Sequence, residues 1–180
     1  MTLFFSKIAG IFPRSRRAIA NRLNKLALNP DADSIHKLIK AAQSNNRFER
    51  CFALEVIGRL GLIAISAVPA QIEAISSSDP FVREAATSSV VRLFSEGIPP
   101  NWELEDDLKK ALASLIHDHV SEGAARHAVK ALSFLSPSIS LLPILEFASL
   151  AVDSSVSKEA KSLYLKISGR LLPPENPTLS

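Results

Sequence analysis

The chain has 180 residues, 47% hydrophobic and 22% charged, which excludes disorder over its whole length and is typical of one folded domain. A single cysteine, Cys51, excludes a disulfide within the chain and a cysteine-based zinc site, and it favours a reducing, cytoplasmic compartment. The net charge of +3 is uneven, because residues 1–30 carry six cations and no acid while the rest is slightly acidic.

The first thirty residues combine an apolar start with a basic amphipathic segment. Residues 3–12, "LFFSKIAGIF", are apolar on most sides, and Pro13 interrupts the pattern. Residues 14–28 place Ile19, Leu23 and Leu26 on one helix face. The apolar and basic candidates for contact with a membrane or a partner are Phe4, Phe5, Phe12, Lys7, Arg14, Arg16, Arg17, Arg22 and Lys25.

Three interpretations of residues 1–30 stay open. They form a helical cap over the end of a repeat array, whose terminal units are often atypical in sequence. Alternatively, residues 1–28 lie on a membrane surface, with phenylalanines in the interface and cations on anionic headgroups. The third interpretation is a transit peptide that directs the chain to an organellar matrix. No membrane-spanning helix is expected, because the longest apolar stretch, around residues 60–70, is shorter than about 20 residues.

An internal repeat predicts helices in the remainder of the chain. Residues 46–60, 79–93, 121–135 and 153–167 align without gaps, and each segment opens with a residue that can cap a helix: Asn46, Asp79, Ser121 and Asp153. Seven residues after each cap stands an alanine: Ala53, Ala86, Ala128 and Ala160. Apolar residues follow four and seven positions after each alanine, the spacing of one helix face.

A shorter helix is predicted before each of these segments, over residues 34–42, 65–76, 105–117 and 139–151. Pro69 stands 17 residues before Ala86, and Pro143 stands 17 residues before Ala160. A proline is tolerated in the first turn of a helix, so this register places both near helix starts.

The stretch "AVPAQIEAISSSDPFVREAATSSVVRLF", residues 67–94, resembles a HEAT repeat through Pro69, Asp79, Arg83, Ala86 and Leu93. The resemblance extends more loosely over residues 33–172. It implies an all-α fold: an α-solenoid of about four antiparallel helix pairs, residues 31–172, with an N-terminal helical cap in residues 1–30. An insertion loop at residues 97–107 holds Trp102, and residues 173–180 are expected to form a flexible tail.

No motif for catalysis, a cofactor or a metal stands out. The chain lacks a glycine-rich phosphate loop, a His-Glu-x-x-His pair and a Gly-x-Ser-x-Gly elbow. His117 and His119 are two residues apart near a predicted helix end, which favours structural histidines over a zinc site. Cys51 has no histidine near it in sequence, so a small packing residue is favoured over a nucleophile.

Two columns of residues on the second helices are candidates for partner binding, since second helices of HEAT-like stacks generally line the concave side. Six positions after the alanines come Arg59, Arg92, Phe134 and Lys166, and three positions before them come Arg50 and Arg83. A basic strip favours an acidic protein segment, whereas the acidic body of the chain disfavours nucleic acid.

We therefore expect a non-catalytic scaffold or adaptor that binds a partner protein through these columns, the Trp102 loop or the N-terminal segment. One alternative is a peripheral membrane subunit of a larger complex, held by its basic N-terminus. Another is a HEAT-like enzyme subunit of the lyase or DNA-glycosylase type, which would need a cleft rich in acids and aromatic residues.

Overall fold

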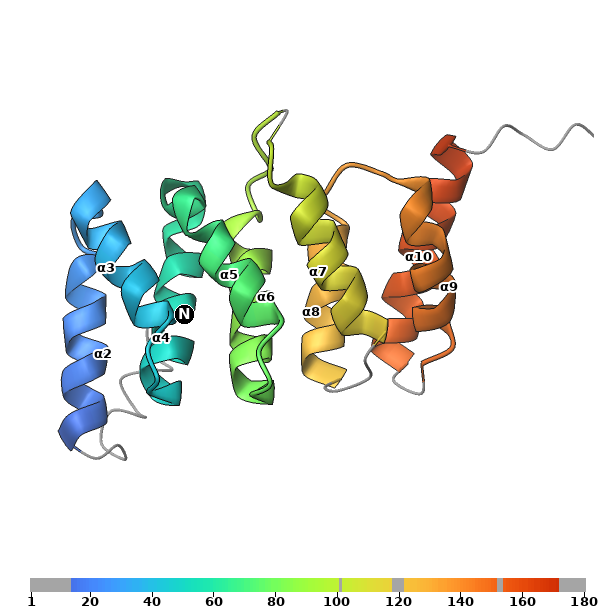
Figure 1. The fold of residues 1–180 in the computed structure, drawn as a ribbon. Coiled ribbons are helices and arrows are strands. Elements are labelled where there is room, and N and C mark those ends of the chain that lie inside the picture. Colours follow the sequence, from blue (N-terminus) through green and yellow to red (C-terminus); the bar gives the residue numbers. More distant parts are fainter. Residues whose placement is uncertain (1–13, 101, 118–121, 152–153, 172–180) are drawn as a thin grey trace, which may run out of the picture. The chain divides into compact units, whose positions relative to one another are not determined.

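The computed structural model describes residues 14–100, 102–117, 122–151 and 154–171, and all regular elements within these ranges are helical (Figure 1). The prediction of an all-α fold is thereby confirmed. The chain divides into two compact units, unit 1 (residues 1–96) and unit 2 (residues 97–180). The boundary falls where the predicted insertion loop 97–107 begins.

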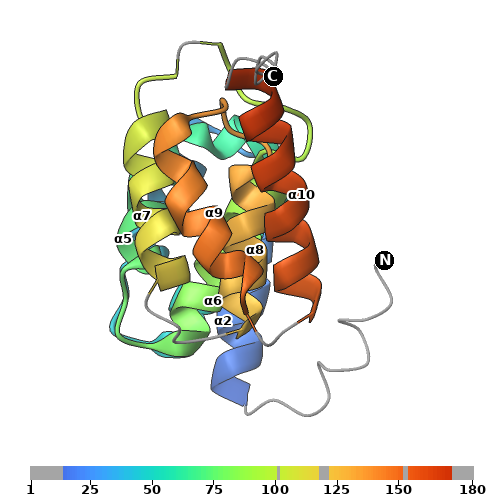
Figure 2. The ribbon, with the colours of Figure 1, turned by 90° about the vertical axis from the view of Figure 1, so that its right-hand side faces the viewer.

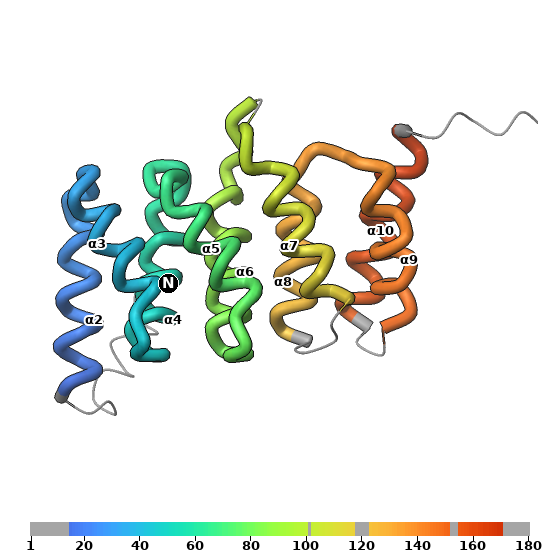
Figure 3. Tube along the Cα trace, in the orientation of Figure 1, coloured from blue at the N-terminus to red at the C-terminus, as the bar shows by residue number. Residues whose placement is uncertain are grey.

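Unit 1 consists of two packed layers of helices. Helix α4 lies between α2 and α6, while α3 packs on α4 and α5 packs on α6, as the tube in Figure 3 shows. In chain order its elements are α2 (Arg14–Leu26), α3 (Ala32–Ala42), α4 (Arg47–Leu60), the 3-10 helix η1 (Gly61–Ala67), α5 (Val68–Ile75) and α6 (Pro80–Leu93).

Unit 2 repeats this kind of packing with fewer helices. Figure 2 shows α7 and α9 on one side of the unit and α8 and α10 on the other, and α8 packs on both α7 and α10. Its elements are α7 (Glu105–His117), α8 (Glu122–Leu132), the 3-10 helix η2 (Ile139–Leu141), α9 (Leu142–Ser149) and α10 (Ser154–Leu171).

Side-chain caps begin the second helices of unit 1 where the repeat predicts them. Asn46 accepts a hydrogen bond from Glu49 N at 3.2 Å and opens α4. Asp79 accepts one from Phe81 N at 3.0 Å and opens α6. Such a bond satisfies a backbone donor that has no partner within the helix. The predicted caps Ser121 and Asp153 lie outside the described residues.

The two repeated prolines stand at the start of α5 and α9, which begin in the same way. Pro69 and Pro143 each stand in the first turn of a helix of 8 residues, and a 3-10 helix precedes each one. Because proline lacks the N–H and restricts the preceding residue, the α-helix begins beside it rather than several residues earlier. The predicted single helices 65–76 and 139–151 are therefore each divided into a 3-10 turn and a short α-helix.

Helix α8 ends at Leu132, three residues before the predicted end at residue 135. The carbonyls of its last turn accept hydrogen bonds from Ser133 N, Phe134 N and Leu135 N in a tightened 3-10-like turn. The chain then turns toward η2, which brings Phe134 and Ser136 to the surface next to α10.

Within each unit the second helices pack on one another, α4 on α6 and α8 on α10, and they carry small buried side chains. Ala53, Ala86, Ala128 and Ala160 are all completely buried. Gly58 of α4 faces α6 so closely that a Cβ placed on it would lie 2.8 Å from the Ser89 Cα. Only glycine fits at that point without moving the backbone of α6.

A chain of buried hydrogen bonds joins α5, α6 and α4 at the same place. Gln71 Nε2 lies 2.6 Å from Ser89 Oγ, which itself donates to the Leu54 carbonyl oxygen at 2.6 Å. Gln71 and Ser89 are both almost fully buried. Because an unpaired buried polar group is costly, these bonds fix the relative register of the three helices.

Residues Arg47–Ile75, 29 in number, form the one stretch of the described chain that is long and apolar enough to cross a membrane by length and composition. Within unit 1 this stretch is divided at Gly61, whose φ of 57° ends α4. Several of its apolar side chains, among them Leu54 and Ile57, belong to the buried core, whereas Leu62 and Ile63 are exposed. In this fold the stretch supplies the core of unit 1.

We expect Gly58→Ala to destabilise unit 1 by about 1 to 3 kcal/mol, because the added methyl group overlaps the backbone of α6. Gly169→Ala is the matched control: it also lies within a helix but meets nothing within 4 Å, so it should stabilise the chain by up to about 1 kcal/mol. Urea denaturation followed by circular dichroism measures both. Equal stabilisation by the two substitutions would mean that the helices can separate freely at Gly58.

Candidate partner-binding surfaces

Helix α2 turns its apolar face toward unit 1 and its charges outward. Leu23 is 1% exposed, and α2 packs on α3 and α4. The guanidinium of Arg16 lies 5.5 Å from the centre of the Phe48 ring, and Arg22 forms an ion pair with Glu49. The side chains of Arg17 and Lys25 are exposed. Of the other N-terminal candidates, Phe4, Phe5, Lys7 and Phe12 and the side chain of Arg14 lie outside the described residues.

A hollow of about 610 Å³ lies between α2 and α3. Leu23, Leu26 and Ala41 contribute apolar surface to it, and three cations line it: Arg22, Lys37 and Lys40. Two of these cations already have acidic partners, since Arg22 pairs with Glu49 and Lys37 with Asp33. The hollow therefore offers little unpaired positive charge.

In unit 1, the column three positions before the alanines ties each second helix to the segment at the end of the helix before it. Arg50 Nε donates to the Ala42 carbonyl oxygen at 3.2 Å, and Arg83 Nη1 donates to the Ser77 carbonyl oxygen at 2.6 Å. A cationic donor at a helix C-terminus satisfies a free carbonyl and meets the negative end of the helix dipole. These contacts give Arg50 and Arg83 a role within unit 1, and Arg83 is only 8% exposed.

The same position in unit 2 is filled by Ser157, whose Oγ donates to the Ser149 carbonyl oxygen at 2.6 Å. A guanidinium in unit 1 and a hydroxyl in unit 2 thus both donate a hydrogen bond to a carbonyl near the end of the preceding helix. The sequence aligns these residues, but it does not show that they reach back to a carbonyl.

The column six positions after the alanines stays at the surface. In unit 1, Arg59 Nη2 donates to Asn24 Oδ1 at 2.5 Å, and Arg92 Nη1 lies 3.5 Å from Glu55 Oε1. Both arginines are exposed, so each contact contributes at most about 1 kcal/mol. Arg59 and Arg92 can exchange these contacts for ones to a partner at little cost.

In unit 2 the same column forms part of a hollowed surface, which we call the α8–α10 groove. It consists of two adjoining hollows of about 360 and 180 Å³ that share Ser133, Leu163 and Lys166. The sequence-predicted residues Phe134 and Lys166 both line the larger hollow. Its other lining residues come from the loop before α7, from the start of α7, from the turn after α8 and from α10. They include Pro99, Pro100, Glu105, Pro137, Ile167 and Arg170.

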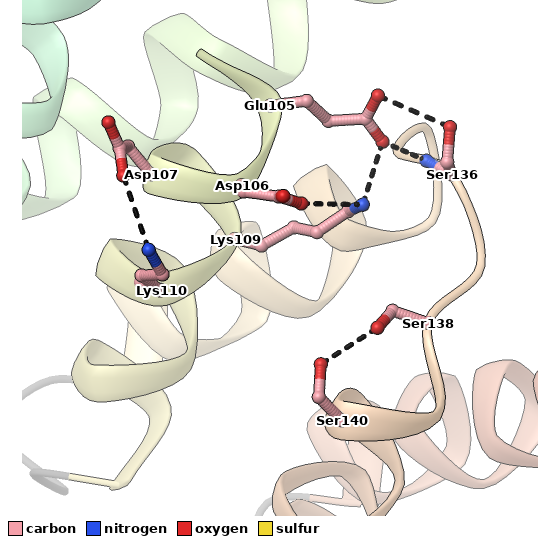
Figure 4. A network of polar contacts seen from close by, with 8 residues as sticks. All are labelled: Glu105, Asp106, Asp107, Lys109, Lys110, Ser136, Ser138 and Ser140. Atoms are coloured by element: carbon pink, nitrogen blue, oxygen red, sulfur yellow. Dashed lines mark hydrogen bonds and ion pairs between the residues drawn. The ribbon is translucent and has the colours of Figure 1, made fainter. Parts of the chain in front are cut away.

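One wall of the groove is a cluster of polar contacts at the start of α7 (Figure 4). Glu105 accepts hydrogen bonds from Ser136 N and from Ser136 Oγ, the latter at 3.2 Å, and Lys109 Nζ lies 3.0 Å from Glu105 Oε1. Burial raises the pKa of Glu105, but Lys109 and the Ser136 donors outweigh it and hold this pKa below its usual value. The ionised carboxylate therefore clamps the turn after α8 onto α7.

Sequence reasoning missed three residues of this groove. Lys130 stands over the Phe134 ring, with its Nζ 5.5 Å from the ring centre. Arg170 lies four residues after Lys166, a helix spacing that the sequence shows and that could have identified it. Glu105 meets Ser136 across 31 residues, which no local pattern reveals. Trp102, by contrast, is half-buried, and its carbonyl accepts a hydrogen bond from Glu105 N at 3.2 Å.

Metal binding and nucleophilic chemistry each depend on particular groups of the described residues. Among them, no group of three or more His, Cys, Asp or Glu side chains is placed to hold a metal ion. Burial, together with the nearby Asp79 carboxylate, raises the pKa of the Cys51 thiol, which keeps it protonated at neutral pH. What the groove offers is apolar surface beside positive charge.

Comparison with protein-family models, with curated proteins and with solved structures finds no match to this chain.

We expect Glu105→Gln to lower the free energy of unfolding by about 1 to 2 kcal/mol at pH 7, because charge-assisted bonds to Lys109 and Ser136 are lost. The folded-state pKa of Glu105 is lowered, so its contribution is fully present above the ordinary pKa of 4.5 and is lost as the pH falls through the folded-state value. The difference between variant and wild type should therefore shrink below about pH 4.5.

Urea denaturation at a series of pH values measures this difference. Glu103→Gln is the matched control, because Glu103 is exposed, and it should change stability by less than about 0.5 kcal/mol at pH 7. A Glu105→Gln effect that stays constant from pH 7 to pH 3.5 would contradict the clamp.

Proposed function

We propose that this chain is a non-catalytic protein-interaction module, a scaffold or adaptor that binds a partner protein through the surface of its second helices. In this proposal α3 to α10 form a HEAT-like α-solenoid of four helix pairs, and α2 belongs to a cap at its N-terminal end. A module of this kind contributes shape and contact area to an assembly rather than chemistry.

Repeated local features support the solenoid. Each of α4, α6, α8 and α10 carries a fully buried alanine at the same position and packs on the helix before it. The proline-started helices α5 and α9 have the same length, and a 3-10 helix precedes each of them. Such regularity is expected where each pair contacts mainly its neighbours.

The α8–α10 groove is the observation that carries the functional proposal. A hollow in which Phe134, Leu163 and Ile167 lie beside Lys166 is a surface that a partner side chain can fill with favourable burial. Arg59 and Arg92 give unit 1 an exposed basic surface of its own. Arg59, Arg92 and Lys166 lie on second helices, whereas Phe134 lies in the turn after α8.

The test is affinity purification of the tagged chain from its native cell, followed by hydrogen exchange on the purified complex. We expect one protein in stoichiometric amount, and protection of residues 129–137 and 159–170 when it binds. Absence of a stoichiometric partner would contradict the adaptor function. Protection restricted to other parts of the chain would contradict the site.

The Arg59→Glu and Arg92→Glu double substitution should weaken partner retention in the same experiment, while the thermal midpoint stays within a few degrees of wild type. The reason is that both side chains are exposed and hold only surface contacts. Glu84→Lys, also exposed on α6, is a control for a change of surface charge. A large loss of thermal stability in the double variant would show that these arginines are structural.

A second candidate is peripheral membrane association through residues 1–28, favoured by the exposed cations of α2, a helix without an acidic residue in its first turn. Since Leu23 of α2 is buried in unit 1, only the charges of this helix are free to meet a membrane. Flotation of the intact chain with anionic liposomes should then be salt-sensitive and should drop on Arg17→Glu with Lys25→Glu. Equal flotation of wild type and variant would exclude this role for α2.

A further inference from the structure

We propose that the α8–α10 groove binds an acidic, extended segment of the partner protein, with one apolar side chain beside Phe134 and carboxylates facing Lys166 and Arg170. This inference rests on the proposed function and adds the chemistry of the ligand.

Among the residues that the structure describes, two cations of the groove have no acidic partner. Lys166 and Arg170 are exposed, line the groove, and form no ion pair with any residue that the structure describes. They are four residues apart on one face of α10, a spacing at which like charges repel by a few tenths of a kcal/mol. The last turns of a helix do favour cations, but that preference does not require both to face one groove.

The cations also stand against the charge of their own unit. Unit 2 contains 8 basic and 10 acidic residues, so its net charge is −2. Lys130, across the groove from α10, stands over the Phe134 ring. Three cations thus gather at one surface of an otherwise acidic unit, which is the charge complement of an acidic ligand.

The larger hollow has apolar side chains at its base. Phe134 is half-buried, while Leu163 and Ile167 of α10 are 6% and 2% exposed and form the base of the larger hollow. Its volume of about 360 Å³ is near the lower end for ligand pockets, about 300 to 1,000 Å³, and suits a side chain better than a large cofactor. Burial of that side chain supplies affinity that charge alone would not.

The acids of the groove determine the direction of the ligand. Both oxygens of Glu105 already accept bonds from Ser136 or Lys109, so this carboxylate offers little repulsion. Glu159 lies at the opposite end, in the smaller hollow. The ligand's carboxylates should therefore lie toward Arg170, and its less acidic end toward Glu159.

The length of the groove limits the ligand. From Glu159 to Arg170, α10 rises by about 16 Å, which equals about five residues of extended chain. The hollow of unit 1 is a weaker candidate for the same ligand, because Arg22 and Lys37 there already have acidic partners.

The experiment measures fluorescence anisotropy of a labelled peptide with one acidic end, Ser-Gly-Leu-Pro-Glu-Asp, titrated with the full chain at low salt. We expect saturable binding with a Kd of about 100 µM or tighter, as for a short peptide that fills one pocket. Replacing its acids by Asn and Gln, or its leucine by serine, should each weaken binding about tenfold. A peptide that binds equally well without its acids would overturn the proposal.

The protein variants locate the site. Lys166→Glu with Arg170→Glu should weaken binding at least about tenfold, whereas Lys158→Glu with Lys161→Glu, an equal charge change on exposed residues of the same helix outside the groove, should change it less than about twofold. Glu159→Lys should strengthen binding about threefold, which keeps the test valid if the first variant fails to fold. An equal loss of peptide affinity in the two double variants would mean non-specific attraction and would overturn the site.

Failure of this inference can be told apart from failure of the adaptor function. If the purified partner is retained by Lys166→Glu with Arg170→Glu and the peptide does not bind, the acidic ligand is wrong and the adaptor function stands. If a chain ending at residue 172 binds the peptide at least about tenfold more tightly, the segment 173–180 occupies the groove, and the proposal of a partner segment is overturned.

Discussion

The close approach of neighbouring second helices at small side chains determines where the other groups of each unit can lie. A fully buried alanine at the same position of each second helix leaves no room for a larger residue, and Gly58 brings the backbones of α4 and α6 into direct contact in unit 1. Packing at this density transmits any change in volume to the neighbouring helix. It also fixes which residues of each helix face outward, and these include the candidate partner-binding residues.

The net charge of each unit does not show where its unpaired cations lie. Unit 1 contains 13 basic and 8 acidic residues, a net charge of +5, yet many of its cations are occupied. Arg50 and Arg83 bind backbone carbonyls at or just beyond helix ends, and Arg22, Arg47 and Arg92 face acids. Unit 2 is acidic overall, yet two cations in one groove, Lys166 and Arg170, form no ion pair with any residue that the structure describes. The groove that we propose for an acidic ligand therefore belongs to the unit with the lower net charge.

Local signals in the sequence predicted much of the fold. Asn46 and Asp79 cap the helices they were expected to cap, and Pro69 and Pro143 start helices, because these effects act within a few residues. The early end of α8 was not predicted, because the apolar pattern continues to Leu135 through the turn.

The candidate site was predictable only in part. Phe134 and Lys166 came from the repeat register and do line one groove, whereas Glu105 entered it through a contact to a residue 31 positions away. The role of Arg50 and Arg83 also depends on where the preceding helix ends in space. An alignment of the repeats does not give this position.

The hydrogen bonds from Gln71 through Ser89 to the Leu54 carbonyl limit the insertion or deletion of helices at this point of the chain. Apolar contacts between repeats are largely interchangeable, so one repeat can often stand in for another. These polar bonds are specific to three helices, and loss of any one would leave a buried group unsatisfied at a cost of about 1 to 3 kcal/mol. Duplication or deletion of a repeat should therefore be tolerated less well between α4 and α6 than at junctions held by apolar side chains alone.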